Sequence, residues 1–165
     1  MPRKKKQKTK ESPKKTPITF QAPGLQPDIR LKVFDDEFIA HSLMLKLYSA
    51  FFRKFLDSSD KQPNHDVQAH DRSGGMDSHV SNGTFKYEWV TEINDDGTWS
   101  LVAASNASQN NPDFSAYKGD KKKDPFAFER LLCTMYMKPY EIQDCEDLKS
   151  IVDLSDYYCA LQWCP

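Results

Sequence analysis

The chain has 165 residues, of which 38% are hydrophobic and 28% are charged, and its mean hydropathy is −0.74. This length corresponds to about one domain. No apolar run approaches the ~18 residues of a transmembrane helix and none follows the basic N-terminus, so we expect neither a membrane span nor a secretory signal. The cysteines show no C-x-x-C spacing, and we interpret all four as reduced thiols: Cys133, Cys145, Cys159 and Cys164.

The net charge of −1 conceals a split along the chain. Residues 1–17 carry eight basic side chains and one acidic one, a net charge of +7, whereas the other 148 residues hold 15 basic and 23 acidic side chains, a net charge of −8. We therefore expect residues 1–26 to form a disordered basic tail and an extended lead-in. The basic run is typical of a nuclear-import signal or a nucleic-acid arm, with candidate residues Arg3, Lys4, Lys5, Lys6, Lys14 and Lys15.

The first half of the chain predicts a hairpin followed by two short helices. Apolar and polar residues alternate over 28–40 around a predicted turn at Asp35-Asp36. A short apolar helix then begins at Leu43, and Ser49 is positioned to cap a second helix, in which aromatic residues recur at helical spacing. Residues 57–83 are rich in Ser, Asp, Asn, Gly and His and predict a long flexible loop.

The second half predicts another hairpin and two more helices. Aromatic residues alternate from Phe85, and Asp95-Asp96-Gly97 predicts the turn before the next strand. Asp124-Pro125 is typical of a helix start, and Asp144 with Asp147 resembles a capping box before the last helix. This order of elements favours an α+β domain. The expected core is Leu31, Val33, Phe38, Leu45, Phe52, Phe55, Leu131, Leu132, Met135, Leu148, Val152 and Tyr158.

Two separate blocks of the sequence resemble the BTB/POZ family. In the first, Asp28 precedes the first strand, Phe38-Ile-Ala-His41 ends the second, Leu45 follows, and Ser49-Ala-Phe-Phe52 opens a helix. The second block runs over 128–136 and 148–161, and the form with Lys86-Tyr-Glu-Trp89 is similar to divergent BTB proteins of filamentous fungi. The resemblance covers residues 27–162, with 57–83 inserted, and its signature positions are Phe38, Leu45, Ser49, Phe52, Leu131, Leu132, Tyr136 and Leu148.

The resemblance implies a BTB/POZ-like fold, with a small mixed or antiparallel sheet flanked by helices, and a non-catalytic protein–protein interaction module. Such domains associate with themselves or with other BTB proteins, and many serve as adaptors on a cullin-based ubiquitin ligase. It also implies that Asp28 and His41 are interaction residues, but Ser42 stands where many members carry a basic partner for that Asp. The alternative is a nuclear transcription or chromatin regulator that uses the basic tail for DNA or import. Nucleus or cytoplasm is the expected location.

Structural interpretations remain open beside these functional ones. Asp28 and His41 also fit a turn cap and a buried, hydrogen-bonded histidine. No hydrolase, P-loop or metalloprotease motif occurs, so we expect no catalytic residue and no cofactor. Cys133 and Cys159 fall on apolar helix faces and predict core packing. A Gly- and Ser-rich loop does not preorganise metal ligands, so we expect no metal at His65, His70 and His79. Sheet packing is favoured over base stacking for Phe85, Tyr87, Trp89 and Trp99.

Overall fold

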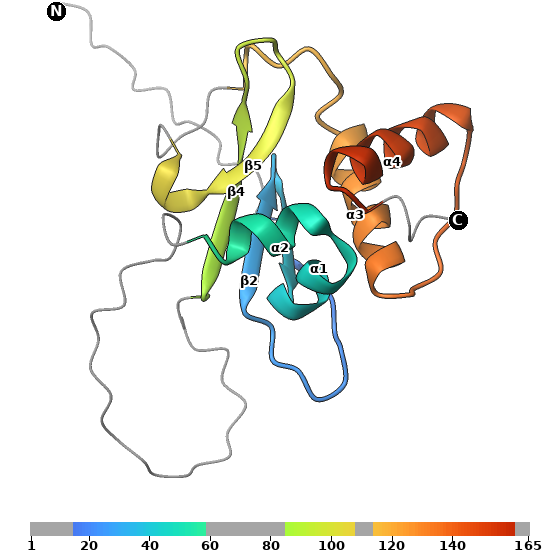
Figure 1. Ribbon diagram of the computed structural model, residues 1–165. Helices are drawn as coiled ribbons and strands as arrows, with labels where there is room; N and C mark the ends of the chain where they lie inside the picture. The colour runs from blue at the N-terminus through green and yellow to red at the C-terminus, as the bar shows by residue number, and fades with distance from the viewer. Residues whose placement is uncertain (1–14, 59–84, 108–113, 161–165) are drawn as a thin grey trace, which may run out of the picture.

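The computed structural model describes residues 15–58, 85–107 and 114–160, and within them the chain has mixed α+β structure (Figure 1). The expected order of two strands, two helices, two strands and two helices is confirmed, with one short strand added in front. In chain order the elements are β1 (Ile18–Thr19), β2 (Ile29–Val33), β3 (Asp36–Ala40), α1 (Ser42–Tyr48), α2 (Ala50–Leu56), β4 (Tyr87–Ile93), β5 (Trp99–Ala103), the 3₁₀ turn η2 (Ala104–Asn106), α3 (Lys123–Met135) and α4 (Cys145–Tyr157).

The strands form one five-stranded mixed sheet in the order β1-β3-β2-β4-β5. Both predicted hairpins are present, because β2 pairs antiparallel with β3 and β4 pairs antiparallel with β5. The two hairpins are joined side by side by parallel pairing of β2 with β4. The alternation of apolar and polar residues in β2 buries Ile29, Leu31 and Val33 completely, so this central strand presents one face to the core.

The first hairpin turns one residue earlier than the sequence predicts. Asp36 pairs with Val33, so the turn consists of Phe34 and Asp35 rather than Asp35 and Asp36. Phe34 adopts a φ of 53°, which is unusual for a bulky residue. Its ring is 1% exposed and packs edge-on against Trp99 and against Phe114, which accounts for the strained backbone.

The sheet and the helices meet in an aromatic core. The Tyr158 ring, just after α4, stacks on Phe52 of α2 with a centroid distance of 5.3 Å and an interplanar angle of 3°. It also meets Phe128 of α3 edge-on at 5.6 Å. The Ser49 hydroxyl donates a hydrogen bond to the Tyr158 carbonyl at 2.5 Å and accepts one from the Phe52 amide, so the predicted cap of α2 is confirmed and also anchors the end of α4.

Two residues of the expected core, Leu148 and Val152, are instead 43% and 42% exposed. The cause is an ion pair between Arg130 of α3 and Asp147 of α4, with 3.1 Å between nitrogen and oxygen and side chains only 6% and 16% exposed. Adjacent helical residues are separated by ~100°, so turning Asp147 toward α3 buries Ile151 four residues on and rotates Leu148 and Val152 outward. The prediction that both residues are core was therefore wrong.

Three further expectations need correction. Helix α3 begins at Lys123, so Asp124 lies inside its first turn and is not its N-cap. Cys159 is exposed, whereas Cys133 is partly buried against the core. The extended lead-in contributes to the fold, because β1 pairs with β3 and the Phe20 side chain is 2% exposed.

Several predicted features lie outside the described residues. These are the basic tail over residues 1–14, nearly all of the predicted loop at 57–83 with its three histidines, and Cys164.

The predicted cap of α4 is confirmed. The Asp144 carboxylate accepts a hydrogen bond from the Asp147 amide at 2.8 Å. Asp147 in turn accepts from the amide of Gln143, next to the cap, which completes an arrangement close to the predicted capping box.

Replacing Phe52 by alanine removes the ring on which Tyr158 stacks. Phe52 is fully buried, and we expect Phe52→Ala to lower the free energy of unfolding by about 3–5 kcal/mol, the usual range for a buried phenylalanine. Urea denaturation followed by circular dichroism measures this. Leu43→Ala is the control, since Leu43 is 58% exposed and its truncation is expected to cost less than ~0.5 kcal/mol. A loss of less than 1 kcal/mol for Phe52→Ala would contradict the core described above.

Candidate functional site

The carboxylate of Asp28 organises the start of α1. Its two oxygens accept hydrogen bonds from the amide and the hydroxyl of Ser42, both at 2.6 Å. The residue before the helix, His41, provides no side-chain cap, so Asp28 acts as the capping group from just before β2. In the family that the sequence resembles, many members carry a basic partner for this Asp at the position of Ser42. Here Ser42 itself is the partner of Asp28. The structure supports the turn-cap interpretation of Asp28.

His41 is 1% exposed and is held by residues from distant parts of the chain. Its Nε2 lies 3.3 Å from the Leu25 carbonyl and its Nδ1 lies 2.8 Å from the Tyr136 hydroxyl. Because a carbonyl only accepts, the geometry assigns the ring proton to Nε2, and the Tyr136 hydroxyl donates to Nδ1 while accepting from the His41 amide at 2.8 Å. Burial raises the pKa of Tyr136 to about 12, which keeps its hydroxyl protonated as this arrangement requires.

Asp28 and His41 are each engaged by a different partner: Asp28 binds Ser42, and His41 binds Tyr136. Six of the eight signature positions are fully buried or nearly so, namely Phe38, Leu45, Ser49, Phe52, Leu131 and Leu132. Tyr136 is partly buried against the core, and Leu148 is exposed. These positions therefore mostly build the interior, and Leu148 alone among them offers apolar surface.

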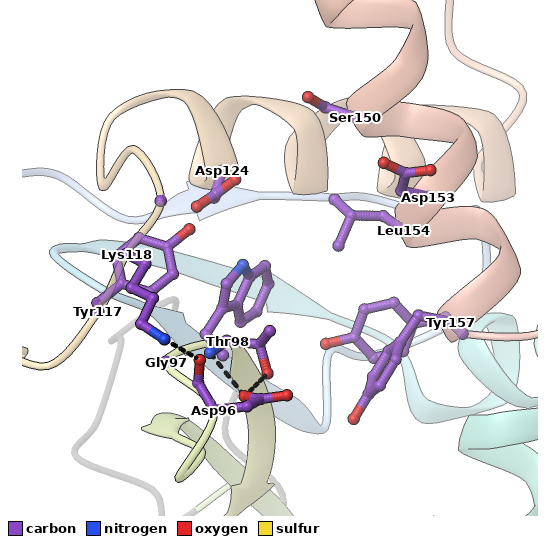
Figure 2. A pocket seen from close by; sticks show the side chains of 13 residues that line it. Asp96, Gly97, Thr98, Tyr117, Lys118, Asp124, Ser150, Asp153, Leu154 and Tyr157 are labelled. Carbon is purple, nitrogen blue, oxygen red and sulfur yellow. Dashed lines mark hydrogen bonds between the residues drawn. The ribbon is translucent and has the colours of Figure 1, made fainter.

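A cavity of about 440 Å³ lies between the β4–β5 turn and the helices α3 and α4. One face of α4 lines it with Ser150, Asp153, Leu154 and Tyr157, at the i, i+3, i+4 and i+7 spacing of a helix. Figure 2 shows these side chains opposite residues of the turn and of the segment before α3. The remaining lining residues are Asp96, Gly97, Thr98, Trp99, Tyr117, Lys118, Gly119, Asp124 and Tyr158. The sequence analysis did not identify this site, because its walls come from three separate segments.

Asp124 is the carboxyl group of the cavity whose ionisation is most strongly opposed. Burial raises the pKa of its carboxyl to about 6, and its Oδ2 atom is buried without a hydrogen-bond partner. Asp96, across the cavity, is in the opposite situation, because hydrogen bonds from the hydroxyl and the amide of Thr98 lower the pKa of its carboxyl. The cavity thus holds one carboxylate with its hydrogen bonds satisfied and one whose ionisation is costly.

Two helices present pairs of apolar side chains to the outside. On α1, Leu43 and Leu47 are 58% and 52% exposed, and we name this pair the α1 surface. On α4, Leu148 and Val152 form the α4 surface. Each pair has i, i+4 spacing and so lies on one side of its helix. Of the four aromatic side chains considered for base stacking, Tyr87 and Trp89 are buried in the core and Trp99 packs against it, whereas Phe85 is half-buried.

In the part of the chain that the structure describes, potential metal ligands are not grouped together. Within it, no three His, Cys, Asp or Glu residues come together as metal ligands would, and the cavity lining contains neither histidine nor cysteine. None of the described helices is long and apolar enough to cross a membrane.

The chain was matched by no family model, no curated protein and no solved structure.

Removing the Tyr136 hydroxyl tests the His41 network. We expect Tyr136→Phe to lower the free energy of unfolding by about 1–3 kcal/mol, because the buried His41 amide and Nδ1 both lose their partner. Urea denaturation measures the change. Tyr140→Phe is a matched control, since its hydroxyl meets only the Thr134 hydroxyl among the hydrogen bonds described. Equal small losses for the two variants would contradict the network.

The raised pKa of Asp124 predicts a specific dependence of stability on pH. The folded state binds this proton more tightly than the unfolded state, so stability falls as the pH rises from about 4 to about 6. Asp124→Asn removes that loss, and we expect it to gain about 1 kcal/mol at pH 7.5 and nothing below pH 4, after allowing for partial exposure. Denaturation of parent and variant across this pH range measures the difference. A gain that is the same at both pH values would contradict the assignment.

Proposed function

We propose that the protein is a non-catalytic protein–protein interaction module of the BTB/POZ type. The observation that carries this proposal is the outward display of apolar side chains on the α1 and α4 surfaces, next to a core in which the other large apolar side chains are buried. Exposed apolar pairs of this kind are not needed for packing, and contiguous ones are typical of interaction surfaces. Covering these side chains with a partner would remove apolar surface from water, which is favourable.

The arrangement of the elements supports the family resemblance. A hairpin, two short helices, a strand that returns parallel to the hairpin's first strand, and a terminal helix pair follow the order in which the resembling blocks occur in the sequence. The signature residues Leu45, Phe52, Leu131 and Leu132 converge in one core although they lie in separate blocks. The proposed partners are a second copy, another BTB protein or a cullin scaffold of a ubiquitin ligase.

A second candidate function follows from the division of charge. The +7 segment over residues 1–17 provides an attachment to an import receptor or to DNA, and the acidic remainder would then recruit partners. Recovery of DNA with the purified protein, lost on raising the salt concentration, would favour this regulator function over a ligase adaptor.

The experiment is purification of the tagged full chain from its own cell extract, with its partners identified and its mass measured by light scattering. We expect a cullin, another BTB protein or a second copy at near-stoichiometric yield. We compare Leu43→Glu/Leu47→Glu with Leu148→Glu/Val152→Glu, because a carboxylate on a desolvated apolar surface opposes binding. At least one variant is expected to lose ten-fold or more of the partner.

Lys149→Glu provides the matched control, since Lys149 is exposed beside Leu148 and its replacement adds charge to α4 without removing apolar surface. Circular dichroism establishes that each variant folds. A folded parent that is monomeric and carries no stoichiometric protein partner, or partner yields unchanged in both double variants, would contradict the proposal.

A further inference from the structure

Thr16 is an exposed hydroxyl residue directly in front of a proline, just before the first strand. Of the ten prolines of the chain, two follow a hydroxyl residue, namely Pro13 after Ser12 and Pro17 after Thr16. Thr16 and Pro17 are both exposed, and β1 begins at the next residue. The residue before a proline is restricted to extended backbone, the form in which a protein kinase binds its acceptor segment. A kinase groove that offers no acceptor for the following amide selects proline there, because proline has no N–H.

The pairing of β1 with β3 places Thr16 beside an acidic side chain. The two strands are parallel, with Ile18 opposite Phe38. The same register, continued two residues toward the N-terminus, sets Thr16 opposite Asp36 on the same face of the sheet. Neighbouring strands are ~4.8 Å apart, so a group attached to the Thr16 hydroxyl is close to the Asp36 carboxylate.

An ion pair fastens this end of β1 to β3. The Lys15 ammonium donates to both carboxylate oxygens of Asp36, at 2.8 and 3.0 Å. A phosphate carries more charge than a carboxylate and competes with it for an ammonium group. Like charges directly opposite one another on neighbouring strands also destabilise the pairing. A phosphate on Thr16 therefore draws Lys15 away from Asp36 and repels the carboxylate that remains.

Strand β1 is the part of the sheet that such a change can open. It is two residues long and lies at the edge, where it pairs with β3 alone. Edge segments of this kind open locally at low cost in free energy. The residue after β1, Phe20, donates its amide to the Ile39 carbonyl at 2.8 Å, and its buried ring lies 5.0 Å from the ring of Tyr136. Opening of β1 therefore reaches the side chain whose hydroxyl holds His41.

We propose that Thr16 is a phosphorylation site for a proline-directed protein kinase and that the phosphate opens β1. In the reaction, the Thr16 hydroxyl oxygen forms a bond to the γ-phosphorus of a nucleoside triphosphate. The bond from that phosphorus to the bridging oxygen breaks, the nucleoside diphosphate leaves, and the hydroxyl proton passes to a base of the kinase. The phosphate adds about two negative charges, which lowers the net charge of residues 1–17 from +7 to about +5. This inference does not depend on the proposed interaction with a cullin or another BTB protein.

Phosphorylation of the folded full chain tests the site. Ser12→Ala leaves Thr16 as the one hydroxyl residue before a proline, and this chain is incubated with ATP and, in parallel, a cyclin-dependent kinase or a mitogen-activated protein kinase. With at least one of them, mass spectrometry is expected to find one phosphate per chain, on Thr16. Pro17→Ala in the same background is the matched control and is expected to lower the rate ten-fold or more. Thr16 left unmodified by both kinases, or equal rates for the two chains, would contradict the proposal.

Amide hydrogen exchange tests the consequence for β1. Phosphorylation of Thr16 is expected to speed exchange of the Phe20 amide five-fold or more and to leave the amides of the central strand β2 unchanged, because only the edge opens. Asp36→Asn removes both the partner of Lys15 and the repelled carboxylate, so the phosphate is expected to change exchange less than two-fold there. Asp35→Asn, in the adjacent turn, is the matched control and is expected to keep the five-fold effect. Unchanged exchange of Phe20 on phosphorylation, or equal effects in the two variants, would overturn the proposal.

Discussion

The packing of Tyr158 joins the two halves of this molecule. Its ring stacks on Phe52 and meets Phe128 edge-on, so one side chain connects the end of α4 with α2 and α3. The backbone next to it is fastened as well, since the Tyr158 carbonyl accepts from Ser49 and the Cys159 carbonyl accepts from the Ala50 amide. Burial raises the pKa of the Tyr158 hydroxyl well above its ordinary value, in keeping with a side chain enclosed on all sides. Aromatic side chains bury more surface area than most others, so the contacts of Tyr158 contribute strongly to the packing of the end of α4 against α2 and α3.

A second constraint sets how α4 is rotated once its end is fixed. Arg130 is held by the Asp147 carboxylate, by the Glu141 carbonyl at 2.9 Å and by the ring of Phe126 at 3.7 Å. Asp147 must therefore face α3, and Ile151 follows it into the interior. The same rotation has two results with functional meaning, because it exposes the α4 surface and turns Asp153 and Tyr157 toward the cavity.

The cavity and the apolar surfaces differ in chemistry. The α1 and α4 surfaces consist of exposed apolar side chains, whereas the cavity is lined by carboxylates and aromatic rings. In the first turn of α3 the helix dipole favours an anion, yet burial raises the pKa of Asp124 to about 6.

The sequence by itself determined the local elements and the class of the fold. Alternation in β2, the cap at Ser49, the cap at Asp144 and the turn after β4 all depend on residues within a few positions of one another, and each was predicted. The BTB/POZ likeness remains an expectation from the residues. Only the tertiary structure decided the features made by distant residues: the bond between His41 and Tyr136, 95 positions apart, the outward rotation of Leu148 and Val152, and the cavity. Periodicity shows that a helix has an apolar side. An ion pair to a neighbouring helix can rotate that side by one residue, as the pair between Arg130 and Asp147 does here. The sequence pattern of one helix does not show which helix packs against it.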